Sequence, residues 1–372
     1  MDEINNHYQQ FQEGPMNYSG IDLHKDNSFI TTINDAGQLI RQSRVRNNEV
    51  AIMQYFQSID GPHRTVVEAT SGWYWLNDLL EANGIEMVLA HAKYIKAIAY
   101  AKVKTDKVDS QTLATLLRMN LVTPAHKISQ ELRGMRDVMR TRLRFVQKRT
   151  ACYNGVHRIA EKFNCDTEIV VSERTTPNQL PEYYRLQLRL LYQQIDMLDQ
   201  QIMELEKSLR NQLIPNEDIQ RLLWIPAFGL ITAYTVYLEI DGIERFSSER
   251  RLFSYCRVVP GASNSNRSLR HKSGNKDGNK YLKIAFTDAA VHATRYYPEI
   301  RAYYQKILRR SNQAIARTVI AKELCRIVFH ILTDKTEYKG FKGKPISRQK
   351  ALNWPRLASP VFGLARNSKP LG

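Results

Sequence analysis

The chain has 372 residues, 43% of them hydrophobic, which is enough for two or three domains with a substantial core. Its net charge of +17 is spread over most of its length, which indicates a polyanionic partner, most simply nucleic acid. Four widely spaced cysteines, with no Cys-x-x-Cys pair and no apolar run of membrane-spanning length, argue against a disulfide scaffold, a zinc site or a membrane partner, and they predict a cytoplasmic protein with reduced thiols.

Strand and helix signals alternate through residues 17–127, after a polar extension over residues 1–16. Short apolar runs bounded by turn residues predict strands over residues 16–23, 28–33, 37–41, 65–69 and 86–90. Helical spacing of apolar residues predicts helices over residues 49–58, 73–83 and 108–119. Three early strands followed by alternating strands and helices describe an α/β domain with a mixed sheet, and this order matches the ribonuclease H-like fold.

The middle of the chain, residues 128–213, has few strand signals and many Arg, Gln, Glu and Leu residues. Its second half carries apolar residues at alternating spacings of three and four, close to a heptad seam: Leu188, Leu191, Ile195, Leu198, Ile202 and Leu205. Pro177 and Pro181 separate two helical stretches. The pattern predicts a long antiparallel helical hairpin or coiled coil, serving as a rigid spacer, as a subunit contact, or as both.

Residues 218–333 form a third, mainly helical region, followed by a basic tail over residues 334–372. The region opens at residues 222–230 with a turn flanked by apolar helices. Such a turn resembles a helix-hairpin-helix, whose backbone amides can hold a DNA phosphate, although a plain helix turn fits equally well. The scattered Pro and Gly of the tail allow it to be disordered alone and to order on nucleic acid.

Four acidic residues in the first third of the chain are candidate metal ligands. Asp22 and Glu68 each close a short strand-like run, whereas Asp106 and Asp109 lie three apart, on one face at the start of a helix. An aspartate at a helix start is often only a cap, but an unpaired carboxylate at a strand end is costly to bury. If the strand ends are neighbours, all four acids can converge on one or two Mg²⁺ or Mn²⁺ ions, which prefer carboxylate and phosphate oxygens.

A polar stretch over residues 260–268, followed by Arg270, His271, Lys272 and Lys276, is the second candidate for chemistry. One of its serines could attack a phosphodiester, with the cations stabilising the charge on the phosphate. Composition alone favours a flexible loop, because Ser, Asn and Gly are typical of turns.

Residues 20–25, 67–72 and 104–109 resemble the DEDD motifs of the bacterial insertion sequence 110 family of transposases, which includes the Piv-type DNA invertases. Similarity to the second domain of that family lies, in order and spacing, at residues 225–229, 246–247, 255–260 and 278–282. The resemblance covers about residues 17–330, and the joint order of these short motifs is specific.

The resemblance implies an N-terminal RuvC-like domain over residues 17–127, a helical coiled-coil middle and a mainly helical C-terminal transposase domain over residues 218–333. It makes Asp22, Glu68, Asp106 and Asp109 both catalytic and metal-binding. It also implies a serine nucleophile, which counting five residues past Pro260 places at Ser265, with Ser263 second and Ser268 third. The chain departs from the family at Ala227, Arg257 and Asn266, where the family has glycine.

The function implied is a transposase and site-specific recombinase of a mobile element in the bacterial cytoplasm, associated with the nucleoid when it acts. A non-coding bridge RNA would pair with target and donor DNA, and a homodimer or homotetramer would exchange strands through a metal-assisted phosphoserine. The alternatives are a RuvC-like metal-dependent DNA nuclease and a DNA invertase whose target is chosen by protein contacts. A non-enzymatic regulator that binds DNA or RNA is a third.

Overall fold

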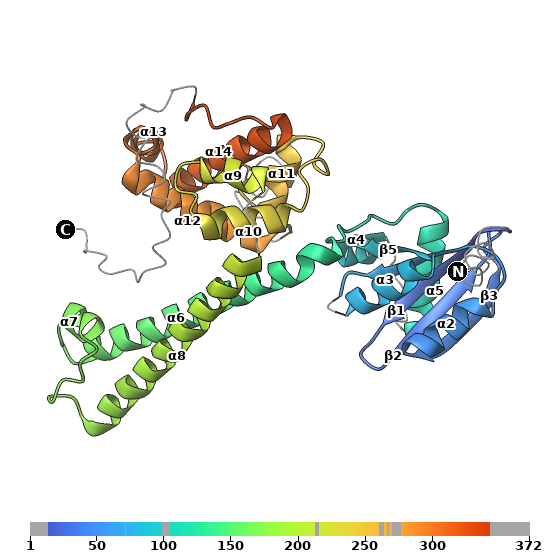
Figure 1. Ribbon diagram of the computed structural model, residues 1–372, viewed down its shortest axis with the longest axis horizontal. Helices are drawn as coiled ribbons and strands as arrows, with labels where there is room; N and C mark the ends of the chain where they lie inside the picture. Colours follow the sequence, from blue (N-terminus) through green and yellow to red (C-terminus); the bar gives the residue numbers. More distant parts are fainter. Residues whose placement is uncertain are drawn as a thin grey trace. The chain divides into compact units, whose positions relative to one another are not determined.

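The computed structural model describes residues 14–70, 72–98, 105–212, 216–259, 264–265, 268–269 and 277–342. The chain divides into two compact units, Met1–Lys127 and Ile128–Gly372, which are coloured blue to teal and teal to red in Figure 1. Among the described residues, the helices are too short or too polar to cross a membrane. The predicted combination of an N-terminal α/β region with a mostly helical remainder is confirmed.

A five-stranded mixed sheet with the strand order β3-β2-β1-β4-β5 is the centre of the first unit. The strands are β1 (Asn17–Leu23), β2 (Asn27–Ile33), β3 (Leu39–Arg46), β4 (His63–Glu68) and β5 (Glu86–Ala90). The first three pair antiparallel, whereas β1 with β4 and β4 with β5 pair parallel. The parallel pairs bring the C-terminal ends of β1, β4 and β5 to the same edge of the sheet.

Four helices accompany this sheet: α2 (Glu49–Gln57), α3 (Trp73–Ala82), α4 (Ala92–Ile98) and α5 (Asp106–Arg118). Several predicted boundaries were wrong: the third strand ends at Arg46 rather than at residue 41, and the fourth begins at His63 rather than at residue 65. Two further differences, at the start of the third strand and of α5, have a clear physical reason. The third strand begins at Leu39, because Gly37 has a φ of +80° and belongs to the preceding turn. Helix α5 begins at Asp106, two residues earlier than predicted, because the Thr105 hydroxyl accepts from the backbone N–H of Val108 and caps it. Helix α4 was not predicted.

Helix α5 packs closely against β1 at Gly20, which allows the helix to approach the sheet. A Cβ atom at Gly20 would lie 2.0 Å from the Ser110 carbonyl oxygen and 2.5 Å from the Ala114 nitrogen. The same contact is fixed by a buried hydrogen bond of 2.6 Å between the hydroxyls of Thr31 on β2 and Ser110 on α5. The residue type at position 20 therefore sets the distance between β1 and α5 at Ser110 and Ala114.

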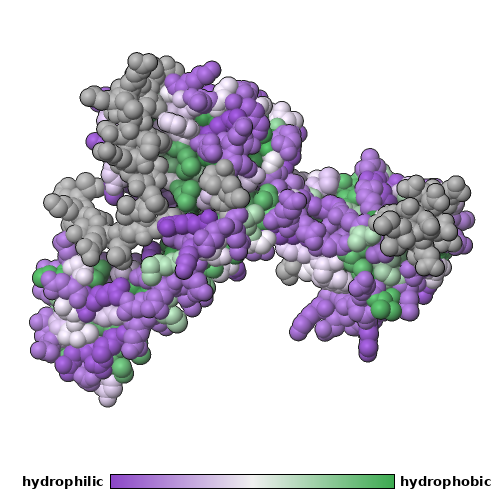
Figure 2. Space-filling model, in the orientation of Figure 1, coloured by the Kyte–Doolittle hydropathy of each residue, from purple (hydrophilic) through white to green (hydrophobic). Residues whose placement is uncertain are grey.

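An antiparallel helical hairpin opens the second unit. Helices α6 (Gln130–Lys162) and α8 (Glu182–Gln212) lie side by side, joined through α7 (Thr167–Ser172) (Figure 1). Residues of the predicted seam, including Leu188, Ile195 and Leu198, are buried. Ion pairs link Arg142 to Glu206 and Arg149 to Asp199, which confirms the antiparallel direction. The outer surface of this hairpin is mainly hydrophilic (Figure 2).

The remaining helices of the second unit share one apolar core. They are α9 (Glu217–Leu223), α10 (Leu230–Ile240), α11 (Glu249–Tyr255), α12 (Lys280–Tyr296), α13 (Pro298–Leu308) and α14 (Gln313–Asp334). Helix α14 supplies ten buried residues, which explains its weak amphipathic pattern: it is covered on several sides. Two short strands, β6 (Asn264–Ser265) and β7 (Ser268–Leu269), form an antiparallel pair between α11 and α12.

Two of the three positions where the resembled family has glycine adopt left-handed backbone here. Ala227, in the turn between α9 and α10, has a φ of +65°, and Arg257, after α11, has a φ of +54°. A residue with a Cβ atom is strained in this region, whereas glycine is not. At both positions the backbone has a conformation that glycine adopts without strain.

Replacing Ala227 with glycine is expected to raise the free energy of unfolding by about 0.5–1 kcal/mol, because it removes this strain. Urea unfolding of the full chain measures the change. The matched control is Ala151→Gly on α6, where the backbone is helical and glycine should destabilise by about 1 kcal/mol. Destabilisation by both variants would contradict the strain at Ala227.

Candidate active site

The strand register places two of the four predicted acids next to each other. Ile21 on β1 pairs with Val67 on β4, so one residue further along both strands Asp22 lies beside Glu68. Side chains alternate across a strand, and Asp22 therefore shares the sheet face of Gly20, against which α5 packs. Glu68, in register with it, lies on the same face at the end of β4.

Helix α5 carries the other two acids in its first turn, Asp106 and Asp109. Because the helix is held on β1 and β2 at Gly20 and Thr31, its N-terminus lies over the C-terminal end of β1. The amide of Gln42 on β3 also donates 3.3 Å to the backbone carbonyl of Lys107. The first turn of α5 is thus tied to a third strand of the sheet.

Asp22, Asp106 and a third residue, His24, converge at this edge. The Nε2 atom of His24 lies 3.2 Å from Oδ2 of Asp22 and 3.4 Å from Oδ1 of Asp106. One ligand atom from each of the three lies within 4.8 Å of the others, the spacing of a group that can share one cation. His24 and Asp106 are more than half exposed, whereas the Asp22 side chain is 24% exposed. His24 and Asp106 are therefore accessible to solvent.

The electrostatics of Asp22 fit a cation site. Burial raises the pKa of the Asp22 carboxyl above its ordinary value, and the nearby carboxylates of Asp106 and Asp109 raise it further, against an opposing effect of His24. Like charges held together in this way disfavour ionisation, and a divalent cation would remove that penalty. Glu68 and Asp109 are partly buried and lie outside the 4.8 Å group, although both belong to the same edge.

The sequence interpretation did not include His24. A usable signal was present, because His24 is two residues from Asp22 and an extended chain points residues i and i+2 to the same side. Carboxylate and imidazole together form a donor set that suits Mn²⁺ as well as Mg²⁺, with the nitrogen favouring the former.

Replacing His24 with alanine is expected to weaken Mn²⁺ binding by about tenfold and Mg²⁺ binding less, because the variant loses a nitrogen donor. Mn²⁺ titration followed by electron paramagnetic resonance measures the affinity, and nitrogen coupling in the wild-type spectrum would show direct coordination. His292→Ala, at an exposed histidine on α12, is the control. Tighter Mn²⁺ binding by the His24 variant would contradict a ligand role.

The serine candidates lie in the other unit. Ser265 is the last residue of β6 and pairs with Ser268, the first residue of β7. The strand pair places the backbones of these two residues opposite each other. Ser263 lies outside the described residues.

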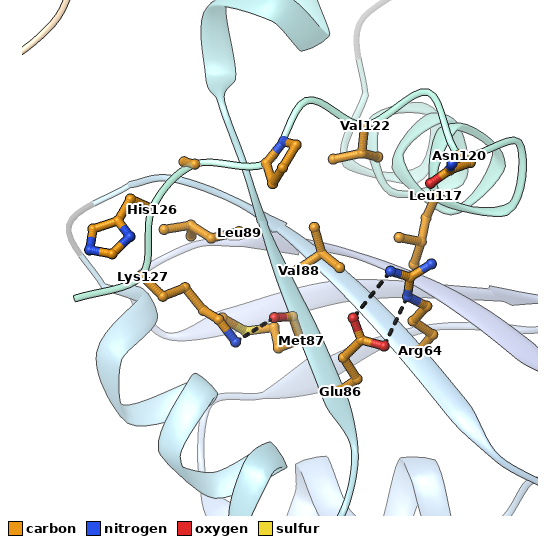
Figure 3. Close-up of a pocket in the computed structure, with 12 residues that line it drawn as sticks. Arg64, Glu86, Met87, Val88, Leu89, Leu117, Asn120, Val122, His126 and Lys127 are labelled. Carbon is orange, nitrogen blue, oxygen red and sulfur yellow. Dashed lines mark hydrogen bonds and ion pairs between the residues drawn. The ribbon is translucent and has the colours of Figure 1, made fainter. Parts of the chain in front are cut away.

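A pocket of about 460 Å³ in the first unit is separate from the acidic group. Figure 3 shows Arg64 and Glu86 joined by two hydrogen bonds, and Lys127 donating to the Met87 carbonyl. Arg64 and Glu86 lie at the starts of β4 and β5, opposite the strand ends that carry Glu68 and Asp22. The pocket therefore does not belong to the acidic site.

Comparison with known proteins gives two family matches that follow each other along the chain. The DEDD transposase model of IS110 matches residues 19–164, and the model described as "Transposase IS116/IS110/IS902 family" matches residues 219–305. The first match contains all four acids. The chain belongs to the insertion sequence 110 family of transposases.

Relatives of this transposase cover most of its length. The transposase for insertion sequence element IS1111A of Coxiella burnetii is 23% identical, over 86% of this chain and 90% of its own. The transposase for insertion sequence element IS1328 of Yersinia enterocolitica is 24% identical, over 86% and 97%. A probable family 20 transposase of Pseudomonas aeruginosa is 24% identical, over 72% and 83%. Membership of the family makes DNA the substrate, and its DEDD domain agrees with a divalent metal at the acidic edge.

Proposed function

We propose that this transposase exchanges DNA strands through a covalent phosphoserine at Ser265, assisted by Mg²⁺ or Mn²⁺ at the acidic edge. Asp22, Glu68, Asp106 and Asp109 would hold the metal. The observation that carries the proposal is the convergence of Asp22 on β1 with Asp106 on α5, two residues far apart in the chain. The strand order β3-β2-β1-β4-β5 supports a RuvC-like assignment of this unit, because its antiparallel and parallel pairs follow the ribonuclease H-like pattern.

The proposed chemistry replaces one phosphorus–oxygen bond with another. The Ser265 hydroxyl gives up its proton and its oxygen bonds to a DNA phosphorus, while the bond from that phosphorus to a deoxyribose oxygen breaks and the released oxygen is protonated. Attack on the phosphoserine by a hydroxyl of the second DNA strand reverses these changes and frees the serine. A bound divalent cation would polarise the phosphate and stabilise the charge that develops there. The bond energy is conserved, so exchange needs no external energy source.

A bridge RNA is the proposed source of sequence specificity. It would base-pair with both target and donor DNA, while the protein holds the backbones of the nucleic acids. The net charge of +17 supports this role. Sequencing the RNA that co-purifies from cells expressing the gene with its native flanks tests it. A single non-coding RNA from those flanks is expected, and only heterogeneous cellular RNA would favour a DNA invertase guided by protein contacts.

We also propose that the hairpin of α6 and α8 joins subunits in a homodimer or homotetramer. Large apolar side chains recur along α8 at intervals of three to seven residues, and each is at least 44% exposed: Tyr183, Leu186, Leu190, Met197 and Met203. Apolar side chains repeated along an exposed helix are typical of helix–helix contacts between subunits.

Replacing Ser265 with alanine is expected to abolish the covalent protein–DNA adduct, because no other atom replaces the attacking oxygen. Denaturing gels measure the adduct, using protein purified with its RNA from cells that express the gene with its native flanks, and a plasmid that carries the gene and those flanks. Ser263→Ala and Ser268→Ala are matched controls and should retain it. Cleavage without any adduct would favour a metal-dependent nuclease, and DNA binding without cleavage would favour a regulator.

A further inference from the structure

A buried polar network joins three elements of the second unit at the start of α12. Both carboxylate oxygens of Glu239 on α10 accept from the Arg140 guanidinium on α6, at 2.6 Å and 2.7 Å. The side-chain amide of Asn279 donates to the same carboxylate at 2.7 Å. The Glu239 side chain is 1% exposed and Asn279 is 8% exposed. A charge placed this deep needs such partners to be tolerated.

Asn279 also lies at the C-terminal end of the serine segment, the stretch between α11 and α12 that contains Ser265. Its Oδ1 atom accepts from the backbone N–H groups of Tyr281 and Leu282 and caps α12. Its own backbone N–H donates to the Tyr255 carbonyl at the end of α11, at 2.6 Å. One residue therefore links the helix that precedes the serine segment, the helix that follows it, and the Glu239 carboxylate.

Residues near Asn279 and at the end of α11 also contact each other at the two ends of the serine segment. Gly278 has a φ of +97°, and a Cβ atom there would lie 2.5 Å from the Tyr255 carbonyl oxygen. Arg257, in its left-handed conformation, donates from Nε to the Asp277 carbonyl at 3.1 Å. The ends of the segment that contains β6 and β7 are thus held together, and the Asn279 amide ties this closure through Glu239 to Arg140.

We propose that Arg140, Glu239 and Asn279 form a clamp that positions Ser265 for attack on DNA. None of the three is proposed to touch the phosphate, so they are positioning residues rather than catalytic ones. A carboxylate held by two parallel guanidinium bonds and one amide bond has a fixed direction, which an apolar replacement would not provide. The inference rests on the proposed function of Ser265. Misplacing a reacting group by about 1 Å lowers a rate about 100-fold.

The protein contains a matched pair that separates positioning from stability. Arg142 and Glu206 form a second buried ion pair, between α6 and α8, through a hydrogen bond of 2.6 Å from the Arg142 Nε atom, and the Glu206 side chain is 7% exposed. Glu239→Gln replaces one accepting oxygen with an amide N–H2 group that faces a donor in the clamp, and Glu206→Gln makes the same chemical change outside it. The two variants should lose comparable thermal stability.

A second, less disruptive clamp variant keeps the test valid if Glu239→Gln fails to fold. Asn279→Ser keeps a side-chain oxygen that caps α12 and keeps the backbone N–H to Tyr255, but removes the donor to Glu239. Its control is Asn312→Ser, because Asn312 caps α14 through a 2.9 Å bond from the Ile315 N–H.

The experiment uses the full chain with its co-purified RNA. It measures the single-turnover rate of adduct formation on the flank-bearing plasmid, the affinity for that plasmid, and the melting temperature. Glu239→Gln and Asn279→Ser should slow adduct formation about 100-fold with DNA affinity unchanged, whereas both controls keep the wild-type rate. Adduct formation at the control rate in both clamp variants would overturn the clamp, provided that Ser265→Ala abolishes the adduct.

A second measurement decides the question independently of the serine chemistry. Hydrogen exchange of residues 264–269 and 277–282 should be faster in Asn279→Ser than in the wild type, and unchanged in Asn312→Ser. Equal exchange in all three proteins would overturn the clamp. Absence of an adduct in the wild type would instead contradict the proposed function, while the exchange result still decides for or against the clamp.

Discussion

Replacing Asp106 with asparagine is expected to lower the rate of DNA strand cleavage by about 10³-fold without unfolding the protein. A metal contributes several kcal/mol of charge stabilisation to a transition state, and an amide oxygen is a weaker ligand than a carboxylate. The Asp106 side chain is 56% exposed and lies in the first turn of α5, so its loss costs little packing. Asp22→Asn should have the same effect, because its ligand atom lies within 4.8 Å of that of Asp106.

Cleavage of the flank-bearing plasmid at fixed Mg²⁺ concentration measures this effect, with Mn²⁺ binding as a second readout. The matched control is Asp26→Asn, which removes an exposed carboxylate in the turn between β1 and β2, only four residues from Asp22. The control should cleave at the wild-type rate. Near wild-type cleavage by Asp106→Asn, with metal affinity retained, would remove Asp106 from the site.

Replacing Gly20 with alanine is expected to destabilise the first unit by about 3 kcal/mol, at the upper end of the usual cost of overpacking. The added methyl group would meet the backbone of α5 at 2.0 Å and 2.5 Å, and backbone atoms cannot rotate away as a flexible side chain can. Relief requires α5 to move off β1, which would carry Asp106 away from Asp22. Cleavage should therefore fall even at temperatures where the variant is folded.

Calorimetric or urea unfolding of the full chain measures the loss, and metal affinity reports the displacement of α5. Gly134→Ala on α6 serves as the control, because nothing lies within 4 Å of the added Cβ atom and alanine favours a helix interior by about 0.5–1 kcal/mol. Gly20→Ala with wild-type stability and metal affinity would show that the contact between α5 and β1 is not the one described.

The sequence was sufficient for the parts of the fold that depend on local patterns. β5 (Glu86–Ala90) has the predicted limits, and β1 and β2 form the predicted hairpin. The predicted seam of α8 is buried at Leu188 and Ile195. The start of α5 was missed, because it depends on the Thr105 cap rather than on apolar spacing. Helix α4 is only seven residues long, too short for a clear periodic signal.

The candidate site was predictable in part. The two strand ends that carry Asp22 and Glu68 are neighbours because β1 and β4 pair parallel, a possibility that their sequence positions left open. Asp22 and Asp106 lie together as expected, whereas the position of His24 beside them became clear only from the three-dimensional structure. Long-range partners such as Arg140 and Glu239 leave no local pattern in the sequence. Each looks like an ordinary charged residue on a helix surface, and their contact depends on how the two helices pack. The roles of the four acids and of Ser265 remain predictions.

The most direct test of the central claim is mass spectrometry of the peptide that remains attached to DNA after wild-type protein is trapped with the flank-bearing plasmid, denatured and digested with protease and nuclease. We expect a nucleotide phosphate on Ser265 that depends on divalent metal and is absent from Asp106→Asn. A nucleotide on a different residue, or complete cleavage with no DNA-linked peptide, would contradict it.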